Sequence, residues 1–290
     1  MKIIAALLVF LLIAPNVFAA GKNSKKKKTK QVAATWIPVA FDETVERLPA
    51  GYKGLDSKQF YKMFSEKTDK LRKGEFENSE QFAIRTANKI DQIAPINTVD
   101  LYAFSISAFN NSEFNINAKR IERYDADAQA YILGVGFYTC KSGYSKDITC
   151  QVGHINFEYE TYVGGNAFGA SVEVTRSRST VFSLAIQNDS TFSKTMFSSK
   201  EVGGIDRYYF IDKIPISSDK ARSLKDKHIS VLFVGRVTGA EMVSGRGFSQ
   251  SASIDSPSDI FISEAAVPFE IKKIIYYVFE TGEIVHQRSF

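Results

Sequence analysis

The feature that most constrains this chain is a two-residue alternation of side chains that begins near Val99 and recurs almost to the C-terminus. Leu101 and Ala103, for example, alternate with the larger residues beside them. Successive side chains of a β-strand point to opposite faces, so this period predicts half-buried strands rather than helices. Turn signals such as Asn110–Ser112 and Gly164–Asn166 separate the segments. We therefore expect about ten to twelve strands, mostly joined by hairpin-type turns. They include separate strands at 167–176 and 180–187 and a last hairpin whose first strand begins at Phe269. The Ser/Thr-rich segment from Asn188 to Gly204 is expected to be a loop.

Helical patterns do not alternate with these strands, which argues against a parallel α/β sheet. The composition agrees with a sheet protein, since the 290 residues include 23 Phe and 13 Tyr. We predict a fold that is mainly β with an N-terminal helical hairpin, an α+β class. Its strands are expected to form an antiparallel sandwich or a curled sheet, arranged as one or two β domains.

The helical hairpin is expected at residues 56–97. An apolar stripe headed by Phe60 follows Asp56–Ser57, which can cap a helix. Gly74 suits the left-handed residue at the end of that helix. Ser79 is expected to cap the second helix.

Residues 1–19 have the pattern of a secretory signal. Lys2 precedes 12 apolar residues, Ile3–Ala14, and Val17 and Ala19 suit cleavage after Ala19. A transmembrane helix needs about 20 apolar residues. A retained, inverted anchor, which lysines beyond the segment would favour, is therefore the weaker alternative. The pattern predicts a periplasmic or secreted protein with no transmembrane segment after cleavage.

Residues 20–55 are expected to be a basic arm followed by an extended linker. The arm holds six lysines and no acid: Lys22, Lys25, Lys26, Lys27, Lys28 and Lys30. Lys2 and the arm carry seven positive charges of a chain whose net charge is +5, so residues 31–290 sum to −2. We hypothesise that the arm binds anionic lipid or a cell-envelope polymer. The alternative is a solvated spacer, and nucleic acid is the least expected partner.

The rest of the linker contains Pro and Gly punctuation and is expected to wrap the surface, with Trp36 and Phe41 docked on the body. The chain then divides into a signal (1–19), arm and linker (20–55), helical hairpin (56–97) and antiparallel β-rich domain (98–290).

Cys140 and Cys150 are the two cysteines of the chain. In an exported protein such a pair indicates a disulfide. The polar segment between them has a turn at Ser142–Gly143, so the bridge is expected near the mouth of a hairpin. A ring of this length stabilises the fold by about 2.8 kcal/mol in the loop-entropy model. The CxxC spacing of redox sites is absent.

Residues 73–85, KGEFENSEQFAIR, resemble a "KGEFET" segment of functionally uncharacterised bacterial exported proteins. Residues 124–129, YDADAQ, resemble the "YDADKQ" that often follows in such proteins. Asn78 and Ala128 depart from the usual Thr and Lys. The resemblance covers about residues 60–140. It implies a bacterial, envelope-directed protein with a helix-then-sheet layout, and it carries over no catalytic residue.

The same segment has a structural interpretation. Phe76 is expected to pack as a hydrophobic staple beside the Ser79 cap, with acids near the positive end of the second helix. Arg85 is expected to pair with Glu77 or Glu80.

Catalytic and metal-binding patterns are scarce. His154, His228 and His286 have no partner at metal-ligand spacing. Glu158 and Glu160 share a strand face and would suit glycoside chemistry under a cleft, but simple strand alternation explains them equally well. No GxSxG elbow, phosphate-binding loop or dinucleotide fingerprint occurs. We expect no metal and no cofactor.

Two aromatic runs, Tyr208–Phe210 and Tyr276–Phe279, place apolar groups on both faces of their strands. We interpret them as strands buried in a two-layer core. The alternative is an exposed aromatic face that binds glycan or protein.

These observations favour a non-catalytic envelope or secreted protein that binds an anionic surface through its arm and a protein partner through its sheet. A hydrolase of envelope polymers and a structural or assembly component are the alternatives.

Overall fold

The structure is a computed structural model. It describes residues 36–68, 74–86, 96, 99–106, 120–135, 139–142, 147–165, 169–202, 205–245 and 247–290. Residues 36–290 form one compact unit. The predicted signal peptide and all six lysines of the arm lie outside the described ranges.

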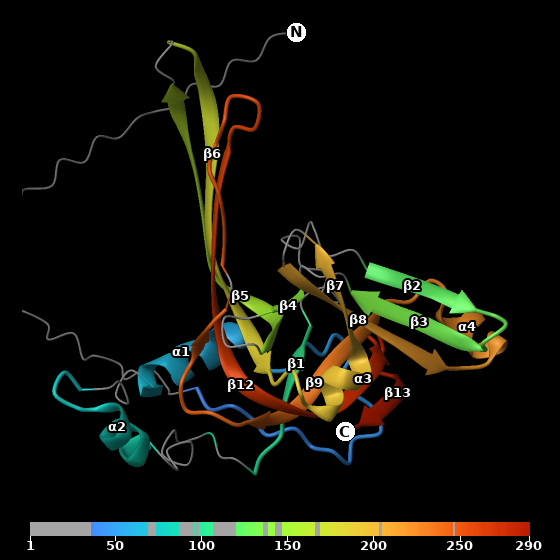
Figure 1. The fold of residues 1–290 in the computed structure, drawn as a ribbon. Coiled ribbons are helices and arrows are strands. Elements are labelled where there is room, and N and C mark those ends of the chain that lie inside the picture. Colours follow the sequence, from blue (N-terminus) through green and yellow to red (C-terminus); the bar gives the residue numbers. More distant parts are fainter. Residues whose placement is uncertain are drawn as a thin grey trace, which may run out of the picture. The chain divides into compact units, whose positions relative to one another are not determined.

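The fold is mainly β, as expected (Figure 1). The helices within the described ranges are short: α1 (Ser57–Thr68), α2 (Ser79–Thr86), α3 (Thr191–Met196) and α4 (Ser218–Leu224). The strands are β1 (Tyr102–Ser105), β2 (Arg120–Asp125), β3 (Ala130–Val135), β4 (Cys140–Ser142), β5 (Ile148–Gly165), β6 (Ser171–Ile186), β7 (Phe197–Val202), β8 (Ile205–Pro215), β9 (Ile229–Val237), β10 (Val243–Ser244), β11 (Phe248–Gln250), β12 (Ser258–Val278) and β13 (Ile284–Ser289). No helix in the part of the chain that the structure describes is both long and apolar enough to cross a membrane.

Strand β12 belongs to two sets of strands. Its C-terminal half pairs antiparallel with β9 and β13, and β9 pairs in turn with β1. Its N-terminal half pairs with β6, and the order then continues β6–β5–β4–β8–β3–β2. The exchange of partners occurs at Pro268, the last residue in register with β6. A proline has no N–H to donate to a ladder, which suits a position where pairing changes.

The β6–β12 pair is parallel, with Ser258–Pro268 in register with Thr175–Ala185. The prediction of antiparallel pairing holds for the other strand pairs within the described ranges and is wrong for this one. The two strands are far apart in sequence, so no hairpin turn fixes their relative direction.

The main core lies between the two sets of strands and is rich in aromatic residues. Phe60 and Phe64 of α1 are fully buried and pack with Phe104 of β1 and Phe182 of β6. Asp56 accepts a hydrogen bond from the backbone of Gln59 at 2.9 Å, which confirms the predicted cap of this helix. The cap therefore places the start of α1 just before the apolar residues that pack against the sheets.

A second apolar cluster lies on the opposite face of β1, β9 and β12. Residues 36–55 cover it as extended chain, with Phe41 packed against it and Leu48 buried within it. The Phe41 amide donates to the Leu101 carbonyl at 2.6 Å, and Trp36 packs edge-on against Phe60. The predicted wrapping of the linker is confirmed. Tyr276, Tyr277 and Val278 are fully buried between the two clusters, as the two-layer interpretation requires.

Helix α2 differs from its prediction in two ways. Asn78, not Ser79, caps the helix. The Asn78 side chain accepts a hydrogen bond from the backbone amide of Gln81 at 2.8 Å, and the Gln81 side chain accepts one from the backbone amide of Asn78. Phe76 is 94% exposed, so it does not form the predicted staple. Arg85 does pair with Glu77, through two contacts of 2.5 and 2.6 Å.

Residues 69–73 and 87–95 lie outside the described ranges. The packing of α1 and α2 as a helical hairpin therefore stays a prediction.

Three boundaries also differ from the sequence pattern. β6 is one continuous strand where two strands were expected on either side of Ser177–Ser179. β12 begins at Ser258, well before the predicted Phe269. A short helix, α3, and strand β7 occupy the segment after Ser190 that was expected to be a loop.

Candidate anion-binding site

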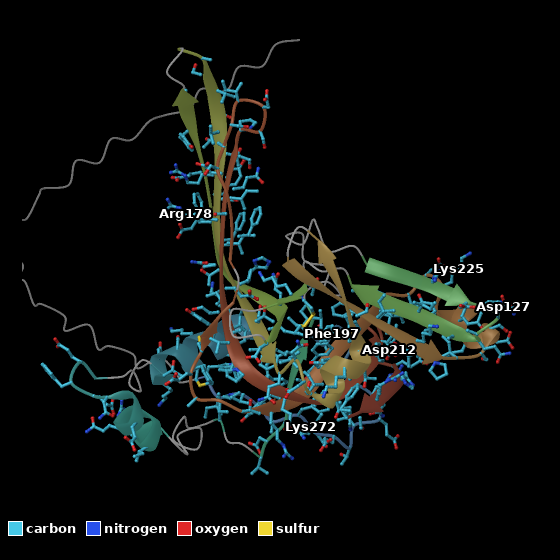
Figure 2. All side chains as sticks on the ribbon, in the orientation of Figure 1. Asp127, Arg178, Phe197, Asp212, Lys225 and Lys272 are labelled. Carbon is cyan, nitrogen blue, oxygen red and sulfur yellow. A yellow bond between two sulfur atoms is a disulfide. The ribbon has the colours of Figure 1, made fainter. Side chains whose placement is uncertain are left out.

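A pocket of about 670 Å³ lies between the β2–β3 hairpin and α4. Its walls come from two places that are far apart in sequence. The lining residues are Arg123, Tyr124, Ala126, Tyr131, Ser218, Ala221, Arg222, Lys225 and Lys227. Figure 2 shows Lys225 beside α4, at the same end of the fold as Asp127 in the β2–β3 turn.

Local hydrogen bonds hold the two walls together. Ser217 caps α4 by accepting from the Lys220 amide, and Ala221 and Leu224 are buried on the inner side of the helix. The segment before α4 is tied to the hairpin, because the Ile216 amide donates to the Gln129 carbonyl at 3.1 Å. The Tyr124 hydroxyl donates to the Ile216 carbonyl at 3.4 Å. The pocket is therefore built on hydrogen-bonded elements.

Four cationic side chains line this pocket, and no Asp or Glu is among its described lining residues. Arg222 makes an ion pair with Asp219, but both side chains are mostly exposed, so solvent screens the pair. Lys225 and Lys227 follow the C-terminus of α4, where the helix dipole favours cations. The site thus concentrates positive charge on a fold whose sequence from residue 31 is net negative.

Two nearby acids are engaged elsewhere. Glu283 pairs with Lys220, and this hydrogen bond holds the pKa of the Glu283 carboxyl below its usual value. Asp125 accepts from the Ala128 amide at 3.0 Å and so belongs to the β2–β3 turn. Asp127 lies within the same turn.

The lining of the pocket suits the binding of an anion. Guanidinium and ammonium groups donate hydrogen bonds to phosphate or carboxylate oxygens. Tyr124 and Tyr131 provide flat apolar walls beside these donors. Its described lining contains no Cys, His or carboxylate that would serve as a general base.

Of the sites predicted from sequence, the disulfide is present. Cys140 and Cys150 are directly opposite each other in the β4–β5 ladder and are fully buried. The pairing at the mouth of a hairpin is as expected. The lysines of the arm lie outside the described ranges, so their role in binding an anionic surface stays a hypothesis.

The histidines do not converge. His154 lies 3.0 Å from the Gln151 side-chain amide, His228 packs near Phe279, and His286 stacks on Tyr276. Burial lowers the pKa of both His154 and His286. Within the described ranges, no group of three His, Cys, Asp or Glu residues could hold a metal ion.

Glu158 and Glu160 share a strand face, as predicted, but they line none of the pockets described for this fold. Glu160 makes a 3.0 Å ion pair with Arg176 of the neighbouring strand. Cross-strand pairing is therefore the better explanation of these two acids.

One buried polar network was missed by the sequence reasoning. Asp212 is 4% exposed and accepts from the Tyr276 hydroxyl at 2.6 Å and from Arg288 at 2.8 Å. These contacts join β8 to β12 and β13. The two-residue alternation along β8 could have indicated that Asp212 is buried, because it falls on the same face as the buried Phe210 and Ile214.

No family model, curated protein or solved structure matches the chain.

Proposed function

We propose that this protein is a non-catalytic binding protein that attaches to anionic groups of the cell envelope. The observation that carries the proposal is the pocket between the β2–β3 hairpin and α4, with its four cationic side chains and two tyrosines. Phosphate or carboxylate groups repeat along envelope polymers and lipid surfaces, and both would meet the same donors.

The lysine arm extends this proposal. Its six positive charges would add attraction to the same kind of surface. Export to the periplasm or beyond, and a helical hairpin at residues 56–97, are the predicted context of the proposal.

Binding to vesicles tests the pocket. Full mature chain, beginning after Ala19, is mixed with vesicles of phosphatidylglycerol and phosphatidylcholine at low salt, with phosphatidylcholine vesicles as reference. The test variant is Lys225→Gln/Lys227→Gln. The control is Lys58→Gln/Lys194→Gln, which removes the same charge from exposed positions on α1 and α3.

Each basic residue near an anionic surface contributes about 1 kcal/mol. The pocket variant should therefore bind about 30-fold more weakly, and the control should lose less. Equal losses in the two variants would leave general charge as the only cause and would defeat the pocket proposal. Deletion of residues 22–30 measures the contribution of the arm separately.

Soluble polyphosphate distinguishes a polymer from a lipid surface. Competition by polyphosphate for the vesicle-bound protein would favour a polyanion that the pocket recognises by its phosphates. Retention on vesicles in excess polyphosphate would favour the lipid surface.

A further inference from the structure

The outer halves of β5 and β6 and the first residues of β12 run side by side as a narrow ladder (Figure 1). β6 is the central strand, antiparallel to β5 and parallel to β12. In β5, residues 156–161 are all exposed. No described element covers either face of this part of β5.

The two faces of the ladder differ in chemistry. The aromatic face has Phe157, Tyr159 and Val163 of β5 on one side and Phe248, Ile260 and Ile262 on the other, with Ser177 and Ser179 of β6 between them. Tyr159 is 62% exposed and Val163 is 74% exposed. Exposed aromatic and branched residues gathered on one face are typical of an interaction surface.

The charged face consists of Glu158, Glu160, Arg176, Arg178 and Asp259. Arg176 contacts Glu160 at 3.0 Å and Asp259 at 3.4 Å, while Arg178 lies over the ring of Phe261. Tyr162 donates to Asp259 at 2.6 Å, and this hydrogen bond lowers the pKa of Asp259. Figure 2 shows Arg178 on the outer part of the ladder. Glu158 and Glu160 at the β5 edge therefore lie on one face of the ladder. Arg176 and Arg178 lie on the same face of the neighbouring strand, β6.

The β5 edge also presents backbone groups. The Thr175 amide of β6 donates to the Pro257 carbonyl, on the β12 side. Thr175 and Thr161 are directly opposite each other in the antiparallel β5–β6 pair. Two such residues either exchange both backbone hydrogen bonds or both direct their amide and carbonyl groups outward. Because Thr175 directs its amide to the β12 side, Thr161 directs its amide and carbonyl away from β6. The same holds for Tyr159 and Val163. No described strand pairs with β5 at these three positions.

Natural sheets protect such edges with Lys, Pro or a covering element. Residues 156–165 contain neither Lys nor Pro, and their charged side chains, Glu158 and Glu160, oppose an acidic strand but not a basic one. The edge is thus a suitable template for one more strand.

We propose that the outer edge of β5 binds an extended segment of a partner protein, which adds as a further strand and alternates basic with apolar side chains. The basic side chains would lie beside Glu158 and Glu160, and the apolar ones would continue the aromatic face. Antiparallel pairing with a second copy of this chain, centred on Tyr159 or on Glu160, would place glutamates opposite each other. Pairing centred on Thr161 would not, so self-association is an outcome that the test below separates from partner binding.

A capped ten-residue peptide of alternating Lys and Val serves as the probe, and the same peptide with Glu in place of Lys is its control. Fluorescence anisotropy gives the affinity for the mature chain, and NMR hydrogen exchange reports on the amides of Tyr159, Thr161 and Val163. We expect binding of the Lys peptide, slower exchange of these three amides, and binding of the Glu peptide at least about tenfold weaker.

Thr161→Pro removes the outward N–H, which an edge strand tolerates, and Thr161→Val keeps it. The proline variant should bind about tenfold more weakly than the valine variant, the effect of losing one ordinary hydrogen bond. Should Thr161→Pro not fold, a Lys–Val peptide N-methylated at alternate amides gives the same comparison from the partner's side. The proposal fails if both variants bind alike, if the Glu peptide binds equally well, or if the edge amides are already protected through self-association.

Discussion

The buried network around Asp212 should couple the two sets of strands energetically, and a double-mutant cycle with Tyr276 measures that coupling. Asp212→Ala leaves the Tyr276 hydroxyl, on a residue with no exposed surface, without its acceptor. An orphaned buried hydroxyl costs about 1–3 kcal/mol. Arg288 has a third of its side chain exposed, so water replaces much of its ion pair, and this loss is about 0–1 kcal/mol.

The single variant should therefore lose about 1–4 kcal/mol of unfolding free energy. At about 2–4 °C per kcal/mol for a chain of this size, its Tm should fall by about 2–16 °C. Tyr276→Phe removes the donor alone and should cost about 1–2 kcal/mol, since Asp212 keeps Arg288 and the Lys213 amide.

Urea unfolding followed by far-UV circular dichroism gives the four free energies of the cycle. The double variant has no orphaned hydroxyl, so it should be more stable than the sum of the single losses indicates, by about 1–3 kcal/mol. Asp219→Ala, which breaks an exposed ion pair, is the control and should change stability by less than about 0.5 kcal/mol. Additivity of the two losses within about 0.5 kcal/mol would refute the coupling.

Two further predictions concern pH and redox state. Burial raises the pKa of Tyr277 to about 12. Its folded pKa lies above the unfolded value of 10.0, so the stability it contributes is complete below pH 10 and is lost between pH 10 and about 12. This loss is about 3 kcal/mol at about 1.4 kcal/mol per pH unit, and Tyr277→Phe should show a flatter alkaline profile in urea titrations. Cys140→Ala/Cys150→Ala should lower the unfolding free energy by about 2.8 kcal/mol, and dithiothreitol should then have no further effect on this variant. Equal stability of this variant and the oxidised wild type would contradict the ring-entropy argument.

The sequence pattern predicted the β-rich body well where one face of a strand is buried. β9 and the C-terminal half of β12 were found because their apolar residues recur in register with a core. The Asp56 cap and the disulfide were found because each rests on local chemistry that tertiary context does not override.

The pattern failed at parts of the outer ladder, where solvent reaches both faces. In the outer ladder, Ser177–Ser179 lie within β6, although a polar run of this kind usually indicates a turn. Where neither face of a strand packs against a core, apolar and polar residues need not alternate along its sequence. Cross-strand ion pairs such as Glu160–Arg176 stabilise the ladder there instead. The same reason explains the late predicted start of β12.

The anion pocket was beyond sequence reasoning for another reason. Arg123 and Lys225 are about a hundred positions apart, and only the packing of α4 beside the hairpin brings them to one cavity. The sequence directed attention to the lysine arm, where charge is contiguous.

The exchange of partners in β12 has a consequence for the order of folding. Residues 258–278 complete both sets of strands, and they come later in the chain than β6 and β9. During synthesis from the N-terminus, β6 and β9 therefore lack a common partner strand until this segment has emerged. Neither set of strands can close before then, so a product truncated before Ser258 lacks the strand that both sets share. Folding intermediates that precede residues 258–278 expose the edges of β6 and β9 together.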